Sequence, residues 1–251
     1  MSHSIEKGSQ IAKDGFKNED EVVEKFNNWQ TDSESQQWLE TMGYDLKEIE
    51  FVEAFKLSGY KTDVQVQVRI KLKNLIDVEN LQVKLVSNPK GFNQIDKRWI
   101  DKYVEMWSIP SEIVGILKRY TGENKPTILN PKDNRRMFAN EFTQNEQVLV
   151  LNWLENNKTL IISDILRGRG KFAAEWILVV LKPNKKNKNS LWTIKPMNIA
   201  VNHFSQGDVI ITKRGNFTIG KITMQRKGGD GGRITANMLQ FKINPAELFG
   251  I

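Results

Sequence analysis

The stretch "NLQVKLVS", residues 80–87, places two polar side chains side by side on one face of an otherwise apolar β-strand. Gln82 and Lys84 are two positions apart, and the side chains of a strand alternate between its faces, so both project from the same face. Three apolar residues alternate with them and are expected to enter the core: Leu81, Val83 and Leu85. The stretch predicts a strand whose polar face carries an amide and an ammonium group.

Upstream, "TDVQVQVRIKL" (62–72) alternates in the same way and has Asp63 at its start. Eighteen residues separate Asp63 from Gln82, enough for a strand, a turn and a return strand. Metal-dependent phosphodiester hydrolysis requires a carboxylate ligand and a cation near the attacking water, which Asp63 and Lys84 would supply. Gln82 would add a neutral oxygen ligand for Mg²⁺. The pattern alone is more typical of an ordinary strand with a solvated face.

Composition limits the chemistry that the chain can perform. It has 251 residues, no cysteine and only two histidines, which excludes disulfides and thiolate sites and disfavours a multi-histidine metal site. The net charge of +7 favours an anionic partner, nucleic acid above all. No apolar run reaches the roughly 18 residues of a membrane span, and the polar start does not resemble a signal peptide. A cytoplasmic protein with no membrane contact is expected.

The remaining periodicity predicts one α/β domain over residues 1–251, with a central mixed sheet flanked by helices and additional C-terminal strands. The N-terminal residues around His3 are expected to be loose. Helices are expected at 18–29, 33–43, 96–107 and 109–122, and after a capping box at 143–146. Strands are expected at 62–72, 81–87, 159–163, 175–182, 190–195, 208–212, 217–225 and 238–243.

Two glycine-rich basic segments are candidates for DNA contact, because Arg and Lys donate to guanine and glycine allows close approach of the backbone. The segment 224–233 offers Gln225, Arg226, Lys227, Asp230 and Arg233. The segment 167–171 offers Arg167, Arg169 and Lys171. The alternative for each is a flexible surface loop.

Other candidates lie near the two strands. Phe92, in a glycine-containing loop, is either a small core anchor or an apolar wedge between base steps, and Gln94 is placed to reach base edges. Glu24 or Glu21 could orient a water at the metal, although an exposed acid on an amphipathic helix is the commoner interpretation. His203 is interpreted as a structural histidine.

Several longer strings carry a family resemblance: "KDGFKNE", "LSGYKTD", "QVKLVSN", "GFNQIDK", "DILRGRG", "FAAEW", "QRKGGDGGR" and "TANMLQFKI". From about residue 8 to the C-terminus the chain resembles the HinP-type Type II restriction endonucleases, which cut GCGC. The resemblance implies a PD-(D/E)xK restriction-endonuclease-like fold and Mg²⁺-dependent hydrolysis of both DNA strands that leaves short 5′ overhangs. It also implies a cognate DNA methyltransferase as functional counterpart.

The resemblance also assigns roles to residues. Catalysis is expected from Asp63, Gln82 and Lys84 on strands at about 62–87, with Thr62 in place of the family's serine. The metal ligands are expected to be Asp63, Gln82 and the backbone carbonyl of Val83, while Lys84 holds the attacking water. DNA-reading loops are expected mostly at 88–94, 165–171 and 224–240. A monomer and a homodimer both remain open, and the rival functions are a structure-specific repair or recombination nuclease and a non-catalytic DNA-binding protein.

Overall fold

The computed structural model describes residues 2–70, 75–182, 190–229 and 232–251. The chain, predicted as one domain, separates into two compact units. Unit 1 comprises Met1–Glu6, Phe92–Ile165 and Val201–Ile243, and unit 2 comprises Lys7–Gly91, Leu166–Ala200 and Asn244–Ile251. Each unit contains one five-stranded sheet.

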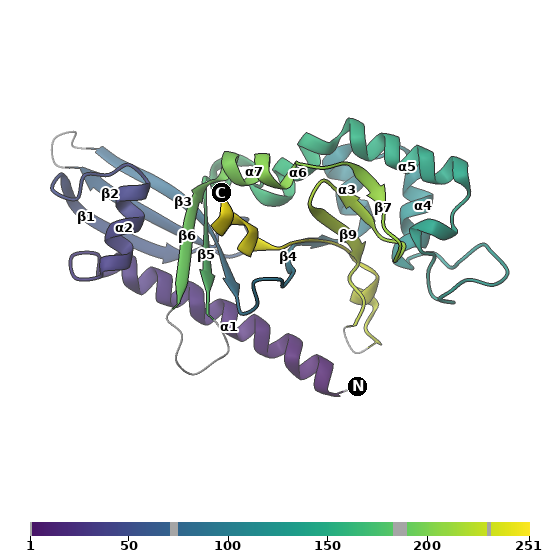
Figure 1. The fold of residues 1–251 in the computed structure, drawn as a ribbon, viewed down its shortest axis with the longest axis horizontal. Coiled ribbons are helices and arrows are strands. Elements are labelled where there is room, and N and C mark those ends of the chain that lie inside the picture. Colours follow the sequence, from purple (N-terminus) through teal and green to yellow (C-terminus); the bar gives the residue numbers. More distant parts are fainter. Residues whose placement is uncertain (1, 71–74, 183–189, 230–231) are drawn as a thin grey trace. The chain divides into compact units, whose positions relative to one another are not determined.

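The sheet of unit 2 has the strand order β1-β2-β3-β5-β6 (Figure 1). Its strands are β1 (Ile49–Lys56), β2 (Val64–Ile70), β3 (Leu75–Val86), β5 (Trp176–Leu181) and β6 (Leu191–Pro196). The β3–β5 pair is parallel and the other pairs are antiparallel, so the predicted mixed sheet is confirmed. Because β5 comes from a distant part of the chain, the pairing of β3 on that side depends on tertiary contacts.

Helices α1 (Ser2–Asn27) and α2 (Ser33–Thr41) contribute to the core of unit 2. Val22 and Phe26 of α1 pack with Trp38 of α2, and the Phe26 and Trp38 ring centroids are 5.2 Å apart. The prediction of a loose N-terminus is wrong, because α1 begins at Ser2, sixteen positions before the predicted helix start at residue 18. A C-terminal turn, η5 (Pro245–Gly250), packs against β3, β5 and β6.

Unit 1 contains an antiparallel sheet of order β4-β10-β9-β8-β7. Its strands are β4 (Asn93–Arg98), β7 (Val209–Ile211), β8 (Phe217–Ile219), β9 (Ile222–Arg226) and β10 (Leu239–Ile243). Its helices are α3 (Ile100–Trp107), α4 (Ser111–Thr121) and α5 (Gln144–Asn156), with short turns η1 (Ala139–Glu141) and η4 (Ile234–Asn237). The capping box predicted before α5 is confirmed by the Thr143 and Glu146 hydrogen bonds.

Helices α6 (Lys158–Leu166) and α7 (Met197–Phe204) lie where the chain passes from one unit to the other. The strand predicted at 159–163 is wrong, because these residues belong to α6. Ile161, Ile162 and Ile165 are fully buried there, and a short apolar run is equally compatible with a strand and a buried helix. The helix predicted at 96–107 begins only at Ile100, because the residues before it belong to β4. Two observed elements, β1 and α7, were not predicted from the sequence patterns. None of the helices in the described ranges is both long and apolar enough to span a bilayer.

Candidate active site

The register of β2 and β3 brings the predicted catalytic residues together within unit 2. Asp63 immediately precedes β2, and its backbone N–H donates to the Leu81 carbonyl at 2.8 Å. Its side-chain Oδ2 accepts from the Val83 backbone N–H at 2.7 Å and lies 3.5 Å from Lys84 Nζ. The carboxylate and the ammonium are mostly shielded from solvent, with 23% and 16% of their side chains exposed. The antiparallel pairing of β2 and β3 therefore brings Asp63 and Lys84, about twenty residues apart in the sequence, close enough to form an ion pair.

Gln82 completes this group with a buried amide whose oxygen is unsatisfied. Only 2% of the residue is exposed, and its Nε2 is 3.5 Å from the Lys61 carbonyl, the outer limit of a hydrogen bond. Its Oε1 has no hydrogen-bond partner within the described residues, which ordinarily costs about 1–3 kcal/mol for a buried acceptor. The next residue, Val83, binds the Asp63 carboxylate, and an unpaired amide oxygen together with a carboxylate is a donor set that suits a hard divalent cation.

The oxygen donors of this site include few acids. Within residues 2–70, 75–182, 190–229 and 232–251, no three His, Cys, Asp or Glu side chains are grouped as metal ligands would be. The residues present fit a metal that also takes ligands from backbone carbonyls, water or a phosphate.

Glu19, in the C-terminal half of α1, is a second acid near the site, and sequence reasoning missed it. Burial raises the pKa of Glu19 to about 7, with a further upward contribution from the Asp63 carboxylate and downward contributions from Lys84 and Lys56. Because the charges of both Asp63 and Lys84 act on Glu19, its carboxyl group lies near this ion pair. We expected α1 to start at Asn18, which made Glu19 look like a first-turn acid that favours a helix terminus.

The acids proposed from the sequence occupy other positions on α1. Glu21 forms an ion pair with Lys182, and Glu24 is exposed. Glu24 is five positions after Glu19, which rotates the two side chains by about 140° around the helix axis. The structure therefore favours Glu19 over Glu24 as the acid that faces Asp63.

The basic segment 167–171 is anchored beside the catalytic strands. Thr62, which is fully buried, donates its hydroxyl to the Phe172 carbonyl at 2.9 Å. Asn80 Nδ2 donates to the Lys171 carbonyl at 3.1 Å, and the Tyr60 and Phe172 rings are 4.2 Å apart between centroids. Thr62 thus fixes the neighbouring loop, and this contact is made by its hydroxyl.

The cationic side chains of that segment face solvent. The three candidates for DNA contact are all exposed: Arg167, Arg169 and Lys171. Gly168 has a positive φ of 79°, and a Cβ there would lie 2.6 Å from Lys61 Cγ. A glycine at this position lets the loop pack on the chain just before Asp63 while the basic side chains on either side point outward.

The other candidate DNA-contacting residues belong to unit 1. Phe92 is 54% exposed, which excludes the core-anchor interpretation, and Gln94 is exposed on β4. Gln225, on β9, and Lys227, just after it, are half-buried, whereas Arg233 is exposed. Asp230 lies outside the described residues.

Arg226 is held within unit 1. Its Nε donates to the Thr121 carbonyl at 2.7 Å, and one Nη donates to Asn237 Oδ1 at 2.6 Å. Two of its donor groups are therefore used by the protein itself, and Arg226 is less available for bidentate contact with a base than its place in the glycine-rich segment 224–233 indicates.

Comparisons with known proteins identify the family. Residues 42–249 match the family described as R.HinP1I restriction endonuclease. A crystal structure of restriction endonuclease MspI in complex with its cognate DNA has a similar fold, with a TM-score of 0.66 and 14% identity over 95% of this chain and 92% of that chain. No curated protein matches the chain significantly.

The family match spans the two catalytic strands, the segment at 167–171 and the turn after β9, and the fold agrees with that of a restriction endonuclease. The resemblance inferred from the sequence strings is confirmed, as is the PD-(D/E)xK-like fold. The chain therefore belongs to the R.HinP1I restriction endonuclease family and is a Type II, site-specific deoxyribonuclease.

Proposed function

We propose that this enzyme hydrolyses duplex DNA at the palindrome GCGC, with Mg²⁺ as its cation, through Asp63, Gln82 and Lys84. The observation that supports this proposal is the ion pair of Asp63 and Lys84 at 3.5 Å beside the unsatisfied Oε1 of Gln82. A nuclease needs an anionic ligand, a further oxygen ligand and a cation at one point, and these three residues provide them. The recognition sequence and the overhang follow from the family.

The metal would be held by Asp63, by Gln82 Oε1 and by the backbone carbonyl of Val83. When bound, a divalent cation polarises the scissile phosphate and offsets its developing charge. Only one of these ligands is charged, so the protein alone should hold the cation less tightly than a site with two carboxylates. Glu19 in its carboxylate form supplies further negative charge near Asp63.

Lys84 would hold the attacking water and stabilise charge on the phosphate. Its Nζ is oriented towards Asp63 and not towards bulk solvent, since only 16% of the side chain is exposed. Gln82 and Lys84 leave the same face of β3, so the water and the metal would lie on one side of the sheet.

DNA contacts would come from the exposed basic and polar side chains described above. Arg167, Arg169 and Lys171 flank the catalytic strands, and Phe92 has the exposure of an apolar wedge that unstacks a base step. Guanine in GCGC would be read by Arg or Lys donors. The further candidates are Gln94, Gln225, Lys227, Asp230 and Arg233.

In the cell, we propose a cytoplasmic enzyme with a DNA methyltransferase of the same specificity as its functional counterpart. A palindromic target is compatible with a homodimer that acts on both strands and with a monomer that cuts them in turn.

Digestion of a plasmid of known sequence with the purified enzyme and Mg²⁺ tests the specificity. Sequencing of the fragment ends is expected to show cuts within every GCGC, with short 5′ overhangs. Cleavage that depends on junctions or flaps would instead indicate a structure-specific nuclease, and DNA binding without cleavage would indicate a non-catalytic DNA-binding protein.

Replacement of Lys84 tests the assigned site. We expect Lys84→Ala to lower the rate of plasmid cleavage by about 100-fold or more while binding to a GCGC duplex persists, because the ammonium acts on the water and the phosphate. Lys47→Ala, which removes an exposed lysine of the same unit, is the matched control. Cleavage by Lys84→Ala at the rate of the control would remove Lys84 from the catalytic group.

A further inference from the structure

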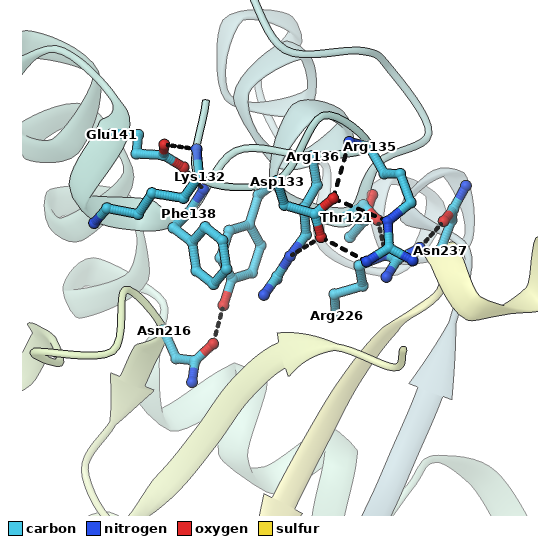
Figure 2. Close-up of polar contacts among 11 residues, drawn as sticks. Thr121, Lys132, Asp133, Arg135, Arg136, Phe138, Glu141, Asn216, Arg226 and Asn237 are labelled. Atoms are coloured by element: carbon cyan, nitrogen blue, oxygen red, sulfur yellow. Dashed lines mark hydrogen bonds and ion pairs between the residues drawn. The ribbon is translucent and has the colours of Figure 1, made fainter. Parts of the chain in front are cut away.

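Three arginines gather in unit 1, where the connection between α4 and η1 meets the end of β9. Figure 2 shows Asp133 between the side chains of Arg135 and Arg136, with Arg226 of β9 beside them. We call Arg135, Arg136 and Arg226 the arginine cluster. Of the three, only Arg226 is a candidate from the sequence, because residues 135 and 136 lie outside any glycine-rich motif.

The positive charge of the arginine cluster is only partly neutralised. Asp133 accepts from Arg135 Nε and one Nη, each at 2.9 Å, and from the Arg135 backbone N–H at 3.0 Å, whereas Arg136 Nε is 4.0 Å away. Glu141, the second acid nearby, accepts from the backbone N–H groups of Lys132 and Phe138, each at 2.7 Å. With Lys132, four cationic side chains therefore surround two carboxylates and leave a net charge of +2.

Arg136 is unusually buried for an arginine. Only 14% of its side chain is exposed, and the guanidinium lies 4.0 Å from the centroid of the Phe138 ring. Its Nη1 has no hydrogen-bond partner among the described residues. A buried cation with an unsatisfied donor is costly, and stacking on an aromatic ring offsets only part of that cost. The protein therefore compensates the charge of Arg136 only in part.

Arg226 is fixed in orientation by its surroundings. Arg226 donates to Thr121 and Asn237. The Asn237 amide in turn donates to the Gly122 carbonyl at 2.9 Å, so this partner of Arg226 is also fixed in position. Burial, followed by the neighbouring charges of Arg136 and Arg135, lowers the pKa of Arg226. Packing thus keeps like charges close together, an arrangement that an anion would stabilise.

From this geometry we infer that the arginine cluster binds a backbone phosphate of DNA, with Arg135 and Arg136 as the contacting residues and Arg226 as a positioning residue that adds positive charge. This inference extends the proposed function, since it supplies a phosphate contact for the same DNA ligand. Planar guanidinium groups match the geometry of phosphate oxygens. A phosphate contact positions the duplex and carries no sequence information by itself.

The test measures the affinity of the full-length protein for a 20-base-pair duplex in EDTA as a function of NaCl concentration, with and without a GCGC site. We expect Arg135→Gln and Arg136→Lys each to weaken binding about 5-fold or more, equally for both duplexes. Loss of one phosphate contact in Arg135→Gln should also reduce the slope of log affinity against log salt by about one. Arg136→Lys keeps the charge but loses the planar fork.

Lys102→Gln is the matched control, because it removes one positive charge from an exposed position on α3 of the same unit. Arg135 is exposed over 69% of its side chain, so Arg135→Gln should fold normally, and circular dichroism of each variant checks this. Suppose that Arg135→Gln and Arg136→Lys bind both duplexes as tightly as Lys102→Gln, with an unchanged slope of log affinity against log salt. The arginine cluster then stabilises the fold of unit 1 and does not contact DNA. Because EDTA suppresses cleavage, the outcome is independent of whether the enzyme cuts GCGC.

Discussion

Gln82 holds a neutral amide where a nuclease of this fold ordinarily has an acid, and its surroundings show the consequence. The amide is 2% exposed with an unsatisfied oxygen, next to a carboxylate that is already bonded to Val83 N–H and paired with Lys84. Without a metal, a second carboxylate here would be buried beside the first. The amide therefore avoids a charge penalty in the metal-free protein at the expense of metal affinity.

Replacement of Gln82 by glutamate tests this balance. We expect Gln82→Glu to lower the melting temperature of the metal-free protein, because a buried carboxylate is placed beside Asp63. Added Mg²⁺ should raise the melting temperature of the variant more than that of the wild type, because binding to the folded state alone stabilises it.

Gln65→Glu is the matched control for that experiment. Gln65 is also a buried glutamine of the same sheet, but its amide is bonded to Asn80 at 2.9 Å. This variant should be destabilised without a comparable recovery in Mg²⁺. Equal recovery of the two variants, measured by thermal denaturation, would contradict a metal ligand at Gln82.

The raised pKa of Glu19 predicts a dependence of stability on pH. Its pKa is about 7 in the folded protein, against an ordinary value of 4.5 for a glutamate, so the folded state binds the proton more tightly. The sign follows: stability is highest below the unfolded pKa and falls as pH rises towards and through about 7. We expect Glu19→Gln, which mimics the protonated form, to melt a few degrees higher than the wild type at about pH 8 without metal, and close to it at about pH 5.

Glu24→Gln provides the comparison, since it removes an exposed acid from the same helix. Its melting temperature should differ from that of the wild type by a similar small amount at both pH values. A Glu19→Gln variant that behaves like Glu24→Gln would show that Glu19 is not desolvated beside Asp63.

At the scale of elements, the active site depends on a loop that three separate contacts hold against the catalytic strands. Thr62 and Asn80 bond to the carbonyls of Phe172 and Lys171, and Gly168 packs on Lys61. The residues before β2 and within β3 therefore carry the proposed catalytic groups and also position a basic segment. A change in this loop should affect cleavage although none of its residues is part of the catalytic group.

Two glycines of the loop allow a controlled test. Both have positive φ, 79° at Gly168 and 75° at Gly170, so an alanine is strained at either position. Only at Gly168 would the added Cβ meet other atoms, since nothing lies within 4 Å at Gly170. We expect Gly168→Ala to lower both the melting temperature and the rate of DNA cleavage more than Gly170→Ala does. Equal effects would mean that the contact with Lys61 is unimportant.

At the scale of the whole molecule, the catalytic residues and the sheet that supports them come from different parts of the chain. Asp63, Gln82 and Lys84 lie within Lys7–Gly91, but β5 and β6 come from Leu166–Ala200. Those later strands supply Leu178, Val180 and Ile194 to the core that also contains Val22 and Phe26. Unit 2 is therefore compact in space and discontinuous in sequence.

This organisation predicts that a fragment of residues 7–91 does not fold alone, although it contains every proposed catalytic group. Without β5, the strand β3 would expose one edge and its apolar face would lose its partners. We expect thermal denaturation of the fragment, followed by circular dichroism, to lack the cooperative transition of the full chain. A cooperative transition in the fragment would show that the core of unit 2 is mostly local.

The chain's local patterns were sufficient for the elements nearest the proposed chemistry. Period-two alternation located β2 and β3, and their polar positions identified Asp63, Gln82 and Lys84 as neighbours, which agrees with the observed register and the Asp63–Lys84 ion pair. The alternation of polar and apolar residues did not show that Gln65 is buried or that 159–163 is helical. Where an element is buried on both faces, its polar and apolar residues no longer mark an outer and an inner face, so the pattern does not identify the element.

The sequence by itself determined the catalytic strand pair, the basic character of the protein and, through its longer strings, its family. Strand alternation and charge are local properties, so they can be read before the fold is known. Only the tertiary structure decided that Glu19 is desolvated within the influence of Asp63, that Gln82 Oε1 lacks a partner within the described residues and that Arg136 lies near Arg226. Each of these depends on which distant segments exclude water from a side chain, and desolvation and charge proximity exist only once those segments have packed together.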